Sequence, residues 1–155
     1  MKNGLRATLL LPLPLVLTLC STGYAASFDD NPPTPEAISQ LEARAQQANP
    51  REQCFLYTEL VHNMTELAGN QILAGNPDQA SATLKKVERY AHLIHLNLAH
   101  DTKRLKNAEL LMHHTTHRLG DYLQAASSDD RETLQATLKQ LDQVQEELLT
   151  QVFAR

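Results

Sequence analysis

Apolar residues recur every three or four positions along most of the chain beyond residue 34. This spacing places them on one face of an α-helix. The longest series is Leu84, Val87, Ala91, Ile94, Leu98, Leu105, Ala108, Met112, Thr115, Leu119, Tyr122 and Ala126. The series misses one step, at Asp101, and keeps its phase on both sides, whereas a loop would normally reset the phase. It therefore predicts one continuous helix over about 77–126, with any bend near Asp101.

Polar residues followed by proline mark three helix starts, at Thr34-Pro35, Asn49-Pro50 and Asn76-Pro77. The polar side chain can cap the first turn, and proline fits the first helical position because its missing N–H is not needed there. A Glu or Gln three residues after each asparagine predicts a capping box. The four predicted helices are 35–48, 50–74, 77–126 and 129–154.

Two residues outside these motifs support the same boundaries. Gly75 suits the left-handed position that closes helix 50–74. The acidic pair Asp129-Asp130 lies in the first turn of the last helix, where the helix dipole favours negative charge.

These elements predict an all-α fold, an antiparallel helical bundle built on the long central helix. Helix 50–74 is expected to fold back on the N-terminal half of that helix, and helix 129–154 on its C-terminal half. If the long helix instead breaks near Asp101, the four rods form an up-down four-helix bundle.

Four large apolar residues lie off the predicted seams: Phe55, Leu56, Leu149 and Phe153. Helix 35–48 can cover part of this surface, and a second copy of the chain or another protein can cover the rest. A homodimer or a protein partner is therefore expected. The alternative is that the chain bends at Asp101 and closes its own bundle.

Composition agrees with helices and one domain. The 155 residues include five Gly, no Trp and 5% aromatic residues, which disfavours an all-β sandwich or a glycine-looped nucleotide-binding sheet.

The first 25 residues resemble a signal peptide. Lys2 and Arg6 precede a mostly apolar run, Leu9–Leu19, that is too short to span a bilayer. Gly23-Tyr24-Ala25 predicts cleavage after Ala25, with Ala26 as second choice. The protein is therefore expected to be exported, periplasmic or secreted, with no transmembrane helix in the mature chain. Residues 26–33 are expected to form a flexible leader and 34–155 a single helical domain.

Two cysteines add to this picture. Lipoprotein processing at Cys20 is disfavoured because Leu19 precedes it where Gly, Ala or Ser is required. Cleavage leaves Cys54 as the only cysteine, so no intramolecular disulfide can form. Its apolar neighbours predict a buried side chain, and an intermolecular disulfide is the alternative.

Cleavage also changes the charge, because the first 25 residues carry two basic residues and no acidic one. The mature chain then has twelve basic against eighteen acidic residues, a net charge of −6 with neutral histidines. Nucleic-acid binding is not expected of such an acidic chain.

Six of the seven histidines lie on the predicted long helix. His113 and His117 are four residues apart and share one helical face, so both could bind one Zn or Cu ion, with His114 as a third candidate. His92 and His95 form a second pair, three residues apart. The heptad register turns most of these side chains outward, which disfavours a haem site that would use Met64 or Met112. The alternative is a solvated helix face without any metal.

No H-E-x-x-H, G-x-S-x-G or phosphate-loop motif is present in the sequence. No catalytic residue and no required cofactor are predicted, and the chain is not expected to be an enzyme. The leading hypothesis is an exported helical interaction or structural protein that self-associates. The alternative is a periplasmic metal-binding or metal- and pH-responsive protein that uses surface histidine pairs.

Three segments resemble parts of uncharacterised exported bacterial helical proteins that have no assigned role: 53–57 (QCFLY), 103–109 (KRLKNAE) and 138–142 (LKQLD). The resemblance covers about residues 50–154. It implies a helical fold and export, and it implies no activity and no site residues.

Overall fold

The computed structural model describes residues 33–98 and 102–154. The expected signal peptide, nearly all of the expected leader, Cys20 and His100 lie outside these ranges. Within them the fold is all-helical and contains no strand, which confirms the all-α part of the prediction. None of the helices in these ranges has the length and hydropathy needed to cross a bilayer.

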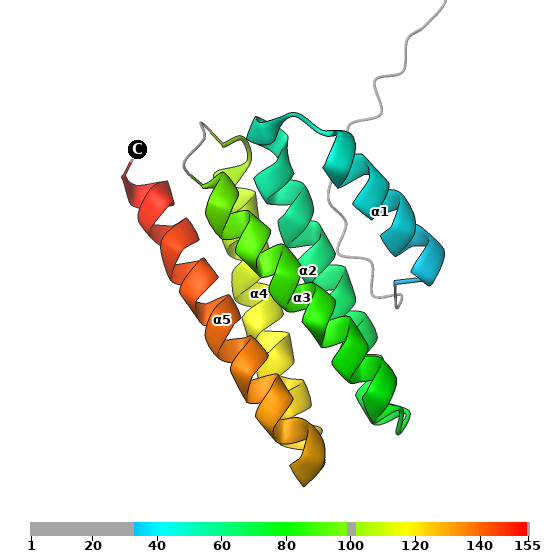
Figure 1. Ribbon diagram of the computed structural model, residues 1–155. Coiled ribbons are helices and arrows are strands. Elements are labelled where there is room, and N and C mark those ends of the chain that lie inside the picture. Colours follow the sequence, from blue (N-terminus) through cyan, green and yellow to red (C-terminus); the bar gives the residue numbers. More distant parts are fainter. Residues whose placement is uncertain (1–32, 99–101, 155) are drawn as a thin grey trace, which may run out of the picture.

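Five helices make up the described chain (Figure 1): α1 (Pro35–Gln47), α2 (Pro50–Leu73), α3 (Pro77–Asn97), α4 (Leu105–Ala125) and α5 (Ser128–Phe153). Proline occupies the first position of α1, α2 and α3, as the motifs predict. The starts at 35, 50 and 77 are those expected, and α5 begins one residue earlier than expected.

The predicted caps are confirmed at one of three sites. The Thr34 hydroxyl accepts a hydrogen bond from the Ala37 N–H at 3.2 Å. The side chains of Asn49 and Asn76 make no capping bond, so the capping boxes are wrong. As at Thr34, the backbone carbonyls of Asn49 and Asn76 accept the first intrahelical hydrogen bonds. Gly75 has φ +74°, which confirms its left-handed position.

The continuous helix over 77–126 is wrong, because α3 ends at Asn97 and α4 begins at Leu105. Arg104 has φ 58°, a left-handed conformation that no continuing helix allows. The Lys103 N–H donates to the Arg51 carbonyl at 2.8 Å, which ties the connection to the start of α2. The connection, 98–104, is one heptad long, so the apolar phase carries across it unchanged.

The chain folds back because each half of the predicted rod gains two partners. α2 packs against α3 and α4, and α5 packs against the same two helices. The four long helices lie side by side as inclined rods, with α1 on the outside next to α2 (Figure 1). The largest fully buried side chains come from all four: Leu60, Met64, Leu84, Ile94, Met112, Leu119, Leu134, Leu141 and Leu148.

Helix α1 covers part of the apolar surface that the sequence left unassigned. Phe55 and Leu56 are buried, as is Ile38 on α1. Polar contacts hold α1 in place, including Arg44 to Glu59 at 2.9 Å. Leu149 and Phe153 on α5 stay exposed, as expected for residues off the seams.

Candidate functional site

The polar side chains between α2 and α4 form the most connected cluster of the molecule's described part. His62 and Glu66 are one turn apart on α2, and Thr115, Arg118 and Tyr122 are three and four residues apart on α4. Residues at these spacings share a helical face, so each set points at the other helix. Residue numbers increase in the same direction along the two sets of contacting residues, so α2 and α4 run parallel here.

Glu66 is held by two partners from α4. Nε and Nη2 of Arg118 donate to its two carboxylate oxygens at 2.9 and 3.1 Å, a bidentate pair. The Tyr122 hydroxyl donates to Glu66 Oε2 at 2.6 Å and accepts from Arg118 Nη2 at 2.7 Å. The three side chains thus form a closed triangle of hydrogen bonds.

The electrostatics follow from this geometry. Burial raises the pKa of Glu66, but the hydrogen bonds from Arg118 and Tyr122 and the Arg118 charge outweigh it, so the pKa lies below its usual value. Burial and the hydrogen bond to Glu66 raise the pKa of Tyr122 to about 12. Glu66 is therefore an anion committed to Arg118, and Tyr122 is a neutral donor at physiological pH.

His62 lies next to this triangle, half-buried between the helices. Its Nδ1 is 3.0 Å from the Thr115 hydroxyl, which donates its own proton to the Leu111 carbonyl at 2.7 Å. A hydroxyl has one proton, so Nδ1–H must be the donor toward Thr115. His62 is therefore the Nδ1–H tautomer, with a lone pair on Nε2. Burial lowers the pKa of His62, and the nearby His114 and Arg118 lower it further against the opposing effect of Glu66.

The ring of His114 on α4 faces His62, with 5.4 Å between ring centres and 56° between ring planes. His114 is exposed, so the pair opens to solvent along one side of the seam. The structure therefore brings together two imidazoles that are 52 residues apart in the chain.

The three histidines predicted as metal ligands point in different directions. His113 Nδ1 lies 3.0 Å from Gln145 Nε2 on α5, whereas His114 faces His62 on α2. His117 pairs with Asp121 one turn along α4, at 3.5 Å. In residues 33–98 and 102–154, no group of three or more His, Cys, Asp or Glu residues could hold a metal ion. A site shared by His113 and His117 alone stays a prediction.

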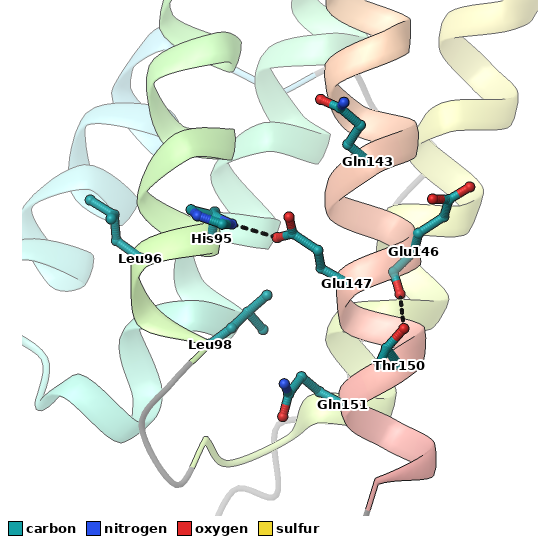
Figure 2. A pocket seen from close by; sticks show the side chains of 8 residues that line it. All are labelled: His95, Leu96, Leu98, Gln143, Glu146, Glu147, Thr150 and Gln151. Atoms are coloured by element: carbon teal, nitrogen blue, oxygen red, sulfur yellow. Dashed lines mark hydrogen bonds and ion pairs between the residues drawn. The ribbon is translucent and has the colours of Figure 1, made fainter.

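A groove between the C-terminal halves of α3 and α5 has a volume of about 870 Å³. Figure 2 shows His95 and Glu147 pointing at each other across it, with Nδ1 to Oε2 at 2.7 Å. Leu98 points into the gap, while Leu96 points away from it (Figure 2). The groove is wide open, and its central imidazole and carboxylate are already paired with each other. His92, the other half of the predicted pair, stacks on His95 with 6.2 Å between ring centres.

A smaller pocket of about 420 Å³ at the start of α4 is lined by Lys103, Arg104 and Lys106, among others. Lys103 Nζ is 3.3 Å from Glu52 Oε1 on α2. The Arg104 guanidinium lies 3.5 Å from the centre of the Phe55 ring. These two cations therefore hold the α3–α4 connection onto α2.

His62 is not among the candidate residues that the sequence pattern indicates. It lies beside Val61 at the edge of the apolar stripe of α2, a position that predicts partial burial, and this was the available signal. Its partner could not be predicted, because the α2–α4 pairing depends on the break between α3 and α4. The chemistry of the seam must be judged from its geometry, because comparisons of the chain with protein-family models, with curated proteins and with solved structures find no match.

Proposed function

We propose that the mature chain is an exported helical interaction protein that forms a homodimer through the outer face of α4 and α5. The observation that carries the proposal is an apolar patch on that face. Leu110 on α4 is 57% exposed, and Leu149 and Phe153 on α5 are 40% and 81% exposed. Exposed apolar residues that gather on one face are typical of protein–protein interfaces.

The three residues are neighbours because of the register between the two helices. Gln145 on α5 contacts both His113 and Thr116 on α4. Leu149 lies one turn after Gln145, and Leu110 lies one turn before His113. Because α4 and α5 are antiparallel, going from Gln145 to Leu149 and from His113 back to Leu110 moves in the same direction along the bundle axis. Leu110 and Leu149 are therefore level, with Phe153 one turn beyond.

The polar residues around the patch favour a second copy of the chain as the occupant. A two-fold axis parallel to the helices places α4 of one copy over α5 of the other at the same level. His113 and His117 of one copy then face Glu146 and Asp142 of the other, and Leu110 meets Leu149. Burial and the Glu146 charge raise the pKa of Asp142, so this acidic pair gains from a partner's donors.

We propose that the scaffold that supports this face is an up-down four-helix bundle of α2, α3, α4 and α5. Chain direction alternates from α2 to α5; α2 packs on α3 and α4 packs on α5 as antiparallel neighbours, whereas α3 and α4 are not a packed pair. Rigid helices present the patch, and we assign the chain no catalytic role.

Sedimentation equilibrium of the tag-free mature chain tests the proposal. A monomer–dimer equilibrium is expected. Leu110→Glu combined with Leu149→Glu should shift it to monomer, because dimerisation would then bury two carboxylates on the α4–α5 face of each copy. Circular dichroism checks that the helices persist.

Two matched controls use exposed leucines on other surfaces. Leu73→Glu at the end of α2 and Leu96→Glu on α3 remove equally exposed apolar side chains. Both variants should dimerise like the parent. A parent chain that stays monomeric at high concentration, or controls that dissociate as fully as the double variant, would refute the α4–α5 interface.

A further inference from the structure

We infer that His62 and His114 form a binding site for a divalent late first-row transition metal ion, with zinc as the reference ion, across the α2–α4 seam. The site does not depend on the proposed dimer, because both of its ligands come from one chain. It also differs from the pair His113 and His117 that the sequence suggests.

The distance between the rings fits one shared ion. An imidazole nitrogen binds Zn²⁺ at about 2.0–2.1 Å, so two rings on one tetrahedral ion have centres about 5 Å apart. The His62 and His114 ring centres are 5.4 Å apart, at an angle of 56°. The two ligands come from helices α2 and α4, which already pack against each other. Binding is therefore expected to need only rotation of the two side chains.

The hydrogen bond to Thr115 prepares His62 for this role. A metal-binding histidine commonly donates its second ring N–H to a nearby oxygen, which sets the tautomer and the ring orientation. His62 donates Nδ1–H to the Thr115 hydroxyl, which is itself committed to the Leu111 carbonyl. The lone pair on Nε2 is therefore the one that remains for a ligand. Thr115 acts as a positioning residue and does not bind the ion.

The surroundings include one nearby carboxylate and, within the described residues, provide no third side-chain ligand. Glu66, one turn from His62, is held by Arg118 and Tyr122, so its charge acts through space. Water completes the coordination shell on the exposed side of His114. Imidazole ligands suit Zn²⁺, Cu²⁺ and Ni²⁺ and are poor ligands for Mg²⁺ or Ca²⁺.

Calorimetric titration of the tag-free mature chain with Zn²⁺ at neutral pH tests the site. One ion per chain is expected, and Mg²⁺ should give no heat of binding. His114→Ala abolishes saturable binding, and because His114 is exposed, this variant keeps the fold. His62→Gln abolishes binding as well.

Matched controls are the neighbouring exposed histidines. His113→Ala and His117→Ala should each bind Zn²⁺ with unchanged stoichiometry and affinity. Loss of binding in either control, retention in His114→Ala, or no saturable binding by the parent would overturn the site. The Leu149→Glu variant, which leaves α4 unchanged, should bind zinc normally, so failure of the dimer and failure of the metal site are separate results.

The role of Thr115 has its own readout. Thr115→Val keeps the side-chain shape and removes the acceptor, and zinc affinity should fall about 10-fold or more. Thr115→Ser should restore it. Nitrogen-15 chemical shifts of His62 should report the Nδ1–H tautomer in the parent and a mixture in Thr115→Val. Equal tautomer populations in both proteins would contradict the positioning role.

Discussion

The ring of Tyr122 on α4 occupies the space that a Cβ atom on Gly69 of α2 would need. An added Cβ would come closer to the ring carbons than real Cβ atoms do. Gly69 is buried within α2, and Tyr122 cannot move aside because its hydroxyl bonds to Glu66 and Arg118. The glycine thus allows the tyrosine to complete the polar triangle between the helices.

Gly69→Ala should therefore destabilise the protein. Overpacking a well-filled contact costs about 1–3 kcal/mol, against a gain of about 0.5–1 kcal/mol from replacing glycine within a helix. Chemical denaturation measures the change in the free energy of unfolding. Gly120→Ala is the matched control, because nothing lies within 4 Å of its added Cβ, and it should stabilise by about 0.5–1 kcal/mol. Equal effects of the two substitutions would contradict the close contact.

The Glu66 triangle should make stability depend on pH. The pKa of Glu66 in the folded chain lies below its usual 4.5, so the carboxylate stabilises the fold fully above that pH. The contribution is lost as the pH falls through the folded pKa. Glu66→Gln should cost about 1–2 kcal/mol at pH 7, because a charged hydrogen-bond acceptor is removed from partly solvated partners. Unfolding free energies of parent and variant should converge as the pH falls below 4.5 and through the folded pKa, and a constant difference would refute this account.

Cys54 should be inert in the native protein. Its side chain is fully buried, and burial raises the pKa of the thiol to about 12, so almost no thiolate exists at pH 8. A thiol-specific reagent should modify the native mature chain only as fast as unfolding exposes the Cys54 thiol. In concentrated guanidinium it should modify the chain at once. Rapid modification of the native chain, or disulfide-linked dimers on a non-reducing gel, would support the intermolecular disulfide instead.

Arg104 stores backbone strain at the start of α4. A non-glycine residue at φ 58° costs roughly 1–2 kcal/mol, and the guanidinium stacked on Phe55 offsets part of this cost. Both Arg104→Gly and Arg104→Ala lose the stacking, but only glycine relieves the strain. Arg104→Gly should therefore be more stable than Arg104→Ala by about 1 kcal/mol in thermal or chemical unfolding.

The same pair of substitutions at Lys86 provides the control. Lys86 is exposed within α3, where alanine should be more stable than glycine by about 1 kcal/mol. If alanine is also the more stable residue at position 104, the left-handed conformation there is wrong.

Helix positions and the buried stripe could be read from the sequence because they depend on neighbouring residues. Proline after a polar residue sets the starts of α1, α2 and α3, and Gly75 ends α2 in a conformation that glycine favours. Met64 and Met112 are buried as the periodicity predicts, and His113 and His117 are exposed. The side chains of Asn49 and Asn76 make no capping bond, and the structure gives no reason for this.

Tertiary structure decided where the long apolar stripe breaks and which histidines meet. The heptad spacing carries across 98–104 with its phase intact, so the missing apolar step at Asp101 could not by itself distinguish a break from a continuous helix. The break is favoured by the burial of apolar surface when α3 and α4 separate and each packs between α2 and α5. This free energy comes from contacts between segments that are distant in the sequence. The facing rings of His62 and His114 follow from that choice. The chain's own periodicity therefore determined its helices and its core, and only the folding back of α4 onto α2 created the site.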